Sequence, residues 1–395
     1  MTSLLATEGS RRWPAESCTP FIAEAGAEVE PFLARCARLL DDRSLPFHTV
    51  TWLRAWYATF GGSDGCHPLL VAVRHRDSGA DAVLLPLVAR RRAGVRVVEF
   101  ADGGVVDYVA PILAPQWHGA LSARAAAPAL WRAVRTALRG HDVLHVHKLL
   151  ACMLEEAGGE PNPLAAAWPV EPCEMFGNQF RVEGDWAHWR LSLDKRTRKE
   201  IERCWRVFQR SPAARFERAT DPARALQLFE ALERQQTQRM QILQPDYALD
   251  APACRAFYRR LIRDGVGSGQ VVVTALMDGE QVVSALFGLA NGQRYIGLRQ
   301  SIGGDAWRNC SPARLLDEQT SRHLHEQGRR FFDFGIGDYH HKQALQMTAI
   351  PLLDACVPLS WRGVPVAMAW RLRRGIKQQG WLVSLWHRAL RLTGH

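Results

Sequence analysis

Residues 271–301, VVVTALMDGEQVVSALFGLANGQRYIGLRQS, decide the fold. Three apolar runs rich in valine, alanine and leucine alternate here with two short turn signals. These signals are the pair Asp278 and Gly279 and the pair Asn291 and Gly292, which favour the two-residue turns of β-hairpins. The stretch therefore predicts three consecutive antiparallel strands.

Two helices are predicted before these strands, and a helix and a strand after them. Residues 223–240 and 251–264 carry apolar side chains at helical spacing. Residues 312–328, PARLLDEQTSRHLHEQG, predict a helix that begins at proline and ends at glycine. Residues 329–338, RRFFDFGIGD, then predict one more strand.

The N-terminal half repeats this order of elements. Helices are predicted near residues 29–40 and 50–60, three strands within residues 68–101, a helix at 123–138 and a strand at 141–149. Two helices, three antiparallel strands, one helix and one strand form the layout of a GNAT domain, which both halves resemble. The predicted fold class is α/β with mixed sheets, built from two tandem GNAT (acyl-CoA N-acyltransferase) domains.

The length of 395 residues exceeds what one ordinary hydrophobic core holds, which favours two domains. We expect an N-terminal GNAT-like domain at residues 1–153 and a proline- and glycine-rich linker at 154–180. A C-terminal GNAT domain that carries the acyl-CoA site is expected at 181–360. A basic amphipathic tail follows at 361–395.

The net charge of +10 is concentrated near the C-terminal end. Residues 361–395 hold seven Lys and Arg and no Asp or Glu, so the rest of the chain carries only +3. A specific nucleic-acid partner is therefore not expected. The apolar and basic residues of the tail recur at helical spacing, which predicts either peripheral contact with an anionic membrane or packing on the protein itself.

Cysteine usage and the N-terminal residues predict a reduced, cytoplasmic protein. The nine cysteines form no CxxC pair, which argues against a disulfide framework and against a zinc knuckle. Charged residues interrupt the N-terminal 17 residues, where a signal peptide needs an apolar run. No uncharged apolar window reaches the length of a transmembrane helix, so we expect contact with the inner membrane face to be peripheral at most.

An anion site is predicted at the start of the helix at 312–328. Ser311 suits the N-cap position, but Arg314 in the first turn opposes the helix dipole unless an anion shares the site. Free backbone N–H groups at a helix N-terminus bind phosphate oxygens. The alternative is a capped surface helix without a ligand.

A second cluster of polar residues follows the last predicted strand, in a glycine-hinged turn. Acyl transfer from a thioester needs a base, an electropositive group near the developing oxyanion and a proton donor for the thiolate. Asp338, Lys342 and Tyr339, respectively, are the candidate catalytic residues. The alternative is that Asp333 and Asp338 only cap turns while Tyr339 packs.

Two further groups receive a structural interpretation. His145 and His147 would share one face of a strand, but no third ligand is evident, so no metal is predicted there or at His340 and His341. Residues 194–210 predict a basic helix with an apolar core stripe. Its first cations either meet coenzyme A phosphates or an anionic acceptor, or form a solvated face, which is the commoner case: Arg196, Arg198 and Lys199.

Five segments between residues 45 and 345 resemble, in order, recurrent blocks of one known family. They are FHTVTWLRAWYATFGG (47–62), LLPLVARRRAG (84–94), SLDKRTRKEIERCWR (192–206), SPARLL (311–316) and FDFGIGDYHHK (332–342). The family is that of the CelD-like GNAT-type acetyltransferases, which are linked to cellulose and other exopolysaccharide biosynthesis. Its tandem GNAT fold is related to that of Fem-like transferases.

The resemblance implies a binding site for acetyl-CoA or another acyl-CoA at the start of the helix at 312–328. The segment RNCSPA (308–313) resembles the GNAT signature Q/R-x-x-G-x-G/A, with Ser311 in place of the first glycine. The family usually shows glycine at position 313 and a Tyr-Lys pair where this chain has Tyr-His-His-Lys (339–342). The implied cofactor-binding residues are Arg308, Ser311, Ala313, Arg314 and Leu315.

The predicted function is an acyltransferase of the GNAT family that acetylates nitrogen or oxygen of a sugar or nucleotide-sugar in cell-envelope or exopolysaccharide biosynthesis. The expected acceptor is thus a small molecule or saccharide. Two alternatives remain open: a Fem-like transferase that takes its aminoacyl group from tRNA, and a non-catalytic scaffold at a polysaccharide synthase.

Overall fold

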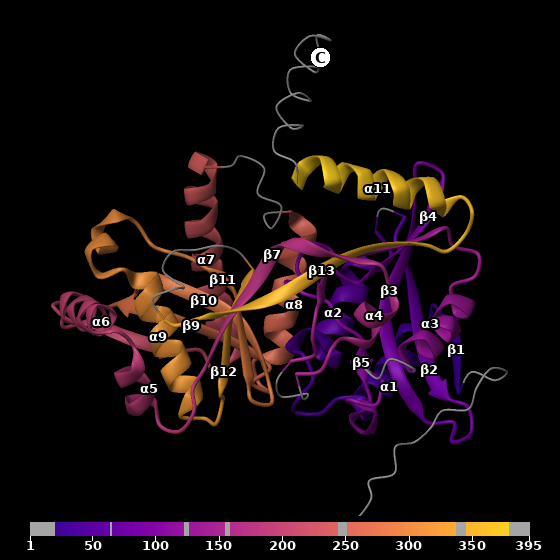
Figure 1. Cartoon of the computed structure of the whole chain (residues 1–395). Helices are drawn as coiled ribbons and strands as arrows, with labels where there is room; N and C mark the ends of the chain where they lie inside the picture. Colours follow the sequence, from indigo (N-terminus) through magenta and orange to yellow (C-terminus); the bar gives the residue numbers. More distant parts are fainter. Residues whose placement is uncertain are drawn as a thin grey trace, which may run out of the picture.

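The computed structural model describes residues 20–63, 65–121, 126–154, 159–243, 251–336 and 345–378. All the strands of these residues belong to one mixed sheet of thirteen strands, with helices on both faces (Figure 1). The order across the sheet is β1-β2-β3-β4-β6-β13-β7-β12-β11-β10-β9-β8, and β5 pairs with β3 beside this path. The α/β fold class is therefore confirmed.

The N-terminal half begins at β1 and ends at β6. It contains the predicted helices and strands in the predicted order, and also the strands β1 and β5, which were not predicted. Its elements are β1 (Phe21–Gly26), α1 (Val29–Leu39), η1 (Pro46–His48), α2 (Val50–Phe60), β2 (His67–His75), β3 (Asp81–Arg92), β4 (Val95–Phe100), β5 (Ile112–Leu113), η2 (Pro115–Trp117), α3 (Ala126–Ala137) and β6 (Val143–Leu150).

The remaining elements include a repeat of this order, from β8 to β12. They are α4 (Pro163–Ala167), β7 (Val170–Arg181), α5 (Trp186–Ser192), α6 (Lys195–Phe208), β8 (Ala214–Arg218), α7 (Pro222–Leu243), α8 (Pro252–Gly265), β9 (Val271–Asp278), β10 (Gln281–Asn291), β11 (Arg294–Gln300), η5 (Asp305–Cys310), α9 (Pro312–His325), β12 (Phe331–Ile336), β13 (Thr348–Pro358) and α11 (Gly363–Gln378).

The strands of the two halves pair in the same pattern. In the N-terminal half β2, β3 and β4 are antiparallel and β4 pairs in parallel with β6. In the C-terminal half β9, β10 and β11 are antiparallel and β11 pairs in parallel with β12. This repeated order of strands is the tandem GNAT arrangement.

Each half extends its part of the sheet with a strand that follows the other half in the chain. β7 follows the N-terminal half in the chain but pairs with β12, and β13 follows the C-terminal half but pairs with β6. β7 and β13 also pair with each other at the centre of the molecule (Figure 1). Without this exchange, β6 and β12 would each expose an unpaired edge.

The expected linker at residues 154–180 contains regular structure. It includes α4 and all of β7 except Arg181, and β7 lies among the central strands. Among the described residues of this region, Pro163 begins α4, and Pro172 and Gly177 lie within β7. Strand exchange therefore places part of the expected linker inside the sheet, although the boundaries themselves stay a prediction.

Alternate residues of β9 face two hydrophobic cores. Val273 belongs to the core beneath α7 and α8, and Val272 belongs to the core beneath α6 and α9. The first core continues into the N-terminal half, where the rings of Trp52 in α2 and Phe257 in α8 lie 4.9 Å apart. The halves consequently share one core.

The described part of the expected tail is helical and lies over the N-terminal half. α11 packs against β13 and β6, and residues beyond 378 lie outside the described part of the chain. None of the helices in the described ranges combines the length and the apolar character needed to cross a bilayer. All eight cysteines of the described residues are free thiols.

Candidate functional site

The backbone around Ser311 opens the candidate site. η5 leads into Ser311, and α9 starts at Pro312, as the sequence predicts. Ser311 occupies the N-cap position with φ 46° and ψ 61°, in the left-handed region that favours glycine, and its side chain caps no N–H group. The GNAT signature has glycine at this position. Ser311 thus lies at the predicted N-cap position, but its hydroxyl does not accept a hydrogen bond from the helix.

A pocket of about 550 Å³ lies at the first turn of α9. Its walls come from α7, from the loop after β11 and from the start of α9. Among the residues whose side chains the structure describes, the lining includes three arginines and no carboxylate: Gln235, Gln238, Arg239, Ile302, Gly304, Arg308, Ser311, Pro312, Ala313 and Arg314. The pocket is suited to an anion because the guanidinium groups and the N-terminal end of the helix dipole act in the same direction.

Four of the five predicted cofactor-binding residues line this pocket. They are Arg308, Ser311, Ala313 and Arg314, and the Nε atom of Arg314 is buried without a hydrogen-bond partner among the described residues. The Leu315 side chain is fully buried in the core beneath α9 and does not line the pocket. Whether these residues hold a cofactor stays a prediction.

Side-chain amides hold the walls of the pocket together. The Nε2 atom of Gln235 in α7 donates to the Val282 carbonyl at 2.7 Å, and its Oε1 atom accepts from the Ser301 hydroxyl at 2.6 Å. On the opposite wall, Nε2 of Gln300 in β11 donates to the Ala313 carbonyl at 3.0 Å. These contacts fix α7, the end of β11 and the first turn of α9 relative to one another.

β11 and β12 separate as they approach the pocket end of the sheet. Their parallel pairing includes only three residue pairs, the last of which joins Ile296 and Asp333. Beyond it, β11 continues to Gln300, whereas β12 continues to Ile336 and pairs with β7 on its other side. The two strands are thus splayed on the side where the pocket lies.

A buried polar junction joins the two halves at β12. The Tyr108 hydroxyl donates to Oδ2 of Asp333, and the Gly335 N–H donates to Oδ1 of the same carboxylate at 2.8 Å. Arg294 lies 3.6 Å from Asp333 and donates to Oε1 of Gln179 at 2.9 Å. Asp333 and Tyr108 are fully buried and Arg294 is 2% exposed, so this junction is closed to solvent.

Asp107 lies against the backbone that leads out of β12. Gly335 has φ +71°, and a Cβ atom at this position would come within 2.3 Å of Oδ2 of Asp107. Asn178 in β7 donates to the Gly335 carbonyl at 3.0 Å. The N-terminal half therefore places an acidic side chain at the start of the segment that holds the predicted catalytic residues.

The predicted catalytic residues Asp338, Tyr339 and Lys342 lie outside the described residues, as do His340 and His341. Their roles stay a prediction. Asp333 forms the turn contact with Gly335 that the alternative interpretation assigns to it, but it also anchors the buried junction.

Sequence reasoning missed Asp107 and Tyr108, which the fold brings from the N-terminal half to β12. A signal was present, because both interrupt the otherwise apolar run VVDYVAPIL (105–113). A polar pair inside such a run indicates a buried partner. The sequence offers no means of identifying that partner 225 residues further along the chain.

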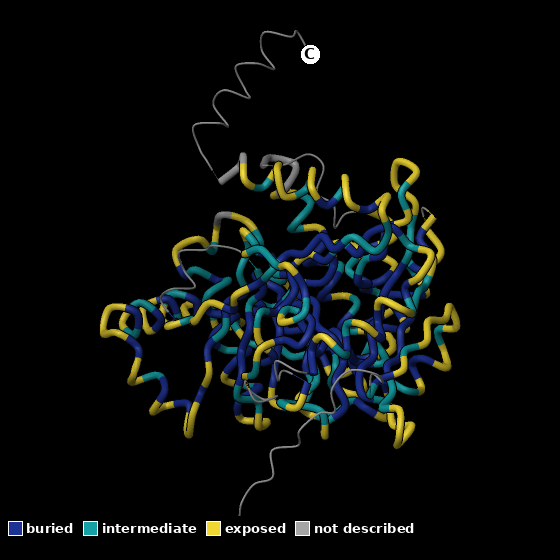
Figure 2. Tube along the Cα trace, turned by 45° about the vertical axis from the view of Figure 1, so that its right-hand side comes forward, coloured by how far each residue is buried: buried dark blue, intermediate teal, exposed yellow. Residues whose placement is uncertain are grey.

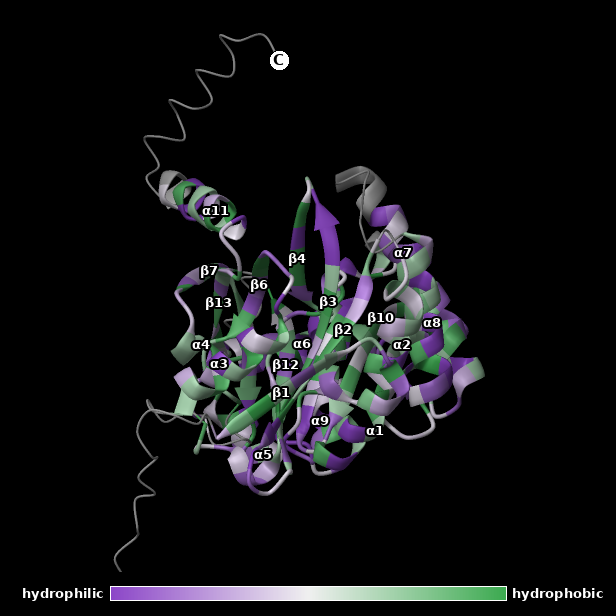
Figure 3. Ribbon diagram, turned by 90° about the vertical axis from the view of Figure 1, so that its right-hand side faces the viewer, coloured by the Kyte–Doolittle hydropathy of each residue, from purple (hydrophilic) through white to green (hydrophobic). Residues whose placement is uncertain are grey.

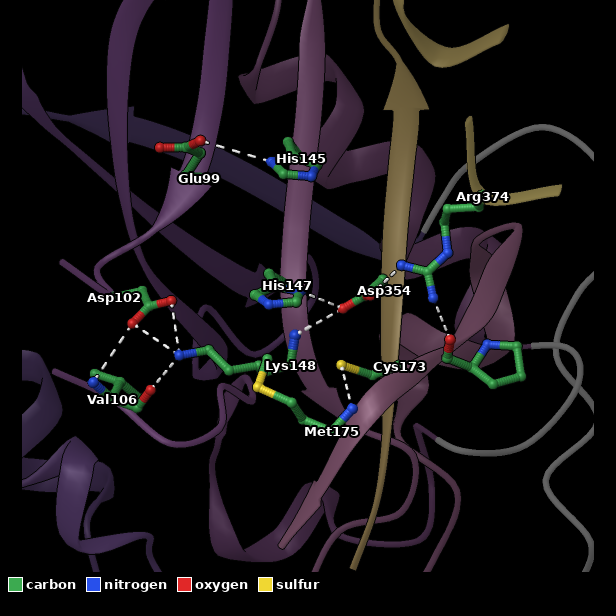
Figure 4. A network of polar contacts seen from close by, with 11 residues as sticks. Glu99, Asp102, Val106, His145, His147, Lys148, Cys173, Met175, Asp354 and Arg374 are labelled. Atoms are coloured by element: carbon green, nitrogen blue, oxygen red, sulfur yellow. Dashed lines mark hydrogen bonds and ion pairs between the residues drawn. The ribbon is translucent and has the colours of Figure 1, made fainter. Parts of the chain in front are cut away.

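The two histidines of β6 do not converge on one site. Nδ1 of His145 lies 3.6 Å from Glu99, whereas Nδ1 of His147 lies 2.6 Å from Asp354 (Figure 4). Burial opposes ionisation of Asp354, but hydrogen bonds from His147 and from the Lys148 amide lower its pKa to about 2. Donor atoms of His147, Cys173 and Asp354 lie within 4.8 Å of one another.

A guanidinium group already neutralises the charge of this cluster. Arg374 of α11 donates to Asp354 and to the Pro172 carbonyl (Figure 4). Its positive charge pairs with the Asp354 carboxylate. The contacts present thus explain the cluster as an anchor for α11.

The cations at the start of α6 are largely exposed. Arg196 and Lys199 are exposed, and Arg198 donates to the Leu191 carbonyl at 2.8 Å. None of the three lines the pocket at α9. The solvated-face interpretation therefore describes them better than phosphate binding does.

Comparison with known proteins agrees with this geometry. Residues 195–343 match the model of an acetyltransferase (GNAT) domain, which supports an acyltransferase. A comparison with curated protein sequences gave no match. The sequence match includes α9 and β12, the two elements beside the pocket and the junction.

Solved structures share the fold at low sequence identity. The crystal structure of FemX superposes with a TM-score of 0.55 and 11% identity, covering 84% of this chain and 96% of FemX. A conserved protein of unknown function from Bacteroides thetaiotaomicron VPI-5482 gives 0.51 and 14%, covering 84% of this chain and 98% of that protein. A tandem GNAT protein from the clavulanic acid biosynthesis pathway gives 0.43 and 12%, with 86% and 98% covered.

Proposed function

We propose that the protein is an acyl-CoA-dependent acyltransferase that transfers an acetyl or related acyl group to nitrogen or oxygen of a sugar or nucleotide-sugar. The observation that carries the proposal is the pocket at the first turn of α9. The described residues that line it include Arg239, Arg308 and Arg314 and no carboxylate. The resemblance to CelD-like acetyltransferases supports an acceptor from cell-envelope or exopolysaccharide biosynthesis.

The charge of the pocket suits the diphosphate of coenzyme A. Phosphate oxygens bind the N–H groups at the first turn of α9, and the guanidinium groups neutralise their charge. The left-handed backbone at Ser311 leaves these N–H groups without a side-chain cap. The acyl chain then extends into the splay between β11 and β12, toward the junction at Asp333.

The chemical step is direct attack of the acceptor on the thioester. Asp338 takes the proton of the amine or hydroxyl, the new bond to the acyl carbon forms and the carbon–sulfur bond breaks. Lys342 stabilises the oxyanion, and Tyr339 returns a proton to the departing thiolate. The contact of Asp333 with the Gly335 N–H supports the start of the segment that carries these groups.

Thiols near the pocket are poorly suited to form a covalent acyl-enzyme. Burial raises the pKa of Cys310 to about 11, and burial raises that of Cys204 as well. Both are therefore weak nucleophiles because the thiolate, not the thiol, attacks an acyl group. This supports direct transfer between donor and acceptor.

A second candidate is an aminoacyl-tRNA-dependent transfer of the Fem type. The fold similarity to FemX favours it, but 11% identity supports the fold alone. A non-catalytic scaffold is the third candidate, and the replacement of the signature glycine by Ser311 favours it. The three candidates differ in whether coenzyme A binds and whether it turns over.

Binding of acyl-CoA tests the proposal directly. A ligand at a hundred times its Kd stabilises the folded state by about 2.7 kcal/mol, which is readily seen as a rise in Tm. We expect acetyl-CoA or a related thioester to raise the Tm. A Tm unmoved by millimolar acetyl-, succinyl- and long-chain acyl-CoA would favour the tRNA-dependent or scaffold candidate.

Two charge reversals on the same helix make this test specific. Arg314→Glu places a carboxylate in the pocket, whereas Arg322→Glu changes an exposed residue near the other end of α9, where Arg322 pairs with Glu326. We expect Arg314→Glu to weaken coenzyme A binding at least tenfold and Arg322→Glu to change it little. Equal losses would remove the anion-site argument.

A further inference from the structure

α11 exposes a continuous apolar surface. Trp361 in the preceding turn is 79% exposed, and Val364, Met368 and Leu372 along the helix are 44%, 64% and 67% exposed. Large hydrophobic side chains with such exposure are otherwise rare in the described residues, where only Ile22 and Leu191 join them. Figure 2 shows the exposed side of α11 along the edge of the molecule.

The opposite face of α11 is docked on the sheet. Ala367 is 3% exposed and packs with Val143 and Cys356, and Trp370 covers the same cluster. Arg374 anchors the helix through Asp354 (Figure 4). Because this face is held by both apolar packing and an ion pair, the exposed apolar residues cannot turn inward.

Cations accompany the exposed apolar face. At roughly 100° per residue, Val364, Met368 and Leu372 lie within one sector of the helix. Arg371 borders this sector next to Val364, whereas Arg373 lies about 100° beyond Leu372, toward the docked face. Both arginines are exposed. Figure 3 shows hydrophilic and hydrophobic residues side by side on α11.

This pattern is that of a helix that lies in the interface of a membrane. Such helices bury an apolar face among acyl chains, while flanking cations meet anionic headgroups. Residues 361–395 contain seven Lys and Arg and no Asp or Glu, so the whole segment complements a negative surface. We propose that α11 is the docking surface for an anionic lipid bilayer, with its axis parallel to the membrane plane.

Charge argues against two other occupants of this face. If a second copy of the chain packed on this face, its own α11 cations would lie against the cations of the first copy. If residues 379–395 of the same chain packed there, they would bring further cations and no acid. Neither occupant would neutralise the positive charge of the arginines beside the apolar sector. An anionic bilayer supplies both the apolar layer and the opposite charge.

Flotation of the full chain with lipid vesicles tests the proposal. We expect the protein to float with phosphatidylcholine vesicles that contain about one third phosphatidylglycerol, and several-fold less with phosphatidylcholine alone. The double variant Met368→Glu and Leu372→Glu should lower binding at least tenfold. Leu191→Glu, at a residue of α5 that is 66% exposed, is the matched control and should bind like the wild type.

Charge and folding are controlled separately. Arg371→Glu with Arg373→Glu should lower binding to the anionic vesicles and weaken its dependence on salt. The substituted side chains of α11 are exposed, so we expect each variant to keep the wild-type Tm within a few degrees. This separates loss of the docking surface from loss of the fold.

Three results would overturn the inference. The first is wild-type protein that does not float with anionic vesicles at low salt. The second is equal binding by the Met368→Glu, Leu372→Glu variant and the Leu191→Glu control. The third is a dimer, measured by light scattering without lipid, that the α11 variant dissociates, because this would assign the face to a second copy of the chain.

Discussion

We expect His48 to make the stability of the fold sensitive to mildly acidic pH. It is the last residue of η1, which contacts β10 and β11 of the other half, and it is only 6% exposed. Burial penalises the charged imidazolium and lowers the pKa of His48 to about 4, although a hydrogen bond with the Ala110 backbone works in the opposite direction. The perturbation that we consider is His48→Gln.

The size of the effect follows from the difference in pKa between the folded and unfolded states. A histidine in the unfolded chain titrates near pH 6.5, so the difference is roughly 2.5 units, or about 3 kcal/mol. Because the folded pKa is the lower one, the unfolded chain takes up the proton first as the pH falls. The contribution of His48 to the free energy of unfolding is therefore fully present above about pH 6.5. It is lost between about pH 6.5 and pH 4 and does not change further at lower pH.

Urea unfolding followed by tryptophan fluorescence measures this contribution. The halves share a core and exchange strands, so we expect one transition. Between about pH 7 and pH 4 the wild type should lose about 3 kcal/mol more than His48→Gln, while His67→Gln, at an exposed histidine of β2, should follow the wild type. Parallel pH profiles for the wild type and His48→Gln would refute the reasoning.

Three further changes test the junction, the anchor of α11 and the predicted chemistry. Tyr108→Phe removes the hydroxyl that donates to the buried Asp333 carboxylate, so the free energy of unfolding should fall by about 1.5 to 3 kcal/mol; a change below about 0.5 kcal/mol in chemical denaturation would contradict this. Asp354→Asn should lower the free energy of unfolding by about 2 kcal/mol above about pH 4. The wild type loses this contribution as the pH falls toward 2, because the pKa of Asp354 is lower in the folded protein than in the unfolded chain. An unchanged acid profile of Tm would argue against this prediction. Asp338→Asn and Lys342→Ala should each lower kcat at least tenfold with the Tm retained, and wild-type rates in acyl-transfer assays would place the chemistry elsewhere.

The elements of the fold were largely predictable from local patterns. The hairpin turns at Asn291 and Gly292 and the apolar alternation of β9 and β10 depend on neighbouring residues, which the sequence displays directly. Pro312 at the start of α9 and Gly328 after it likewise have local causes, because one lacks an N–H group and the other has φ +93°. The strands β7 and β13 were harder to assign because their partners lie far away in the chain.

The candidate anion site was predictable from the sequence only in part. Arg314 in the first helical turn opposes the helix dipole, and this local feature is what predicts an anion there. Arg239, which lies 75 positions earlier in the chain, reaches the same pocket only because α7 packs beside the end of β11. Leu315 carries the same helical spacing as its neighbours, and only the packing shows that its side chain points into the core.

The sequence by itself determined the class of fold, the repeat of one unit and the basic character of residues 361–395, because each depends on residue types and on spacing along the chain. Tertiary structure alone decided which strands are exchanged between the halves and which residues meet Asp333. It also decided that Met368 and Leu372 remain exposed while Arg374 is held by Asp354. Such pairings depend on contacts between distant segments. These contacts stabilise the protein only when the fold has brought both segments together.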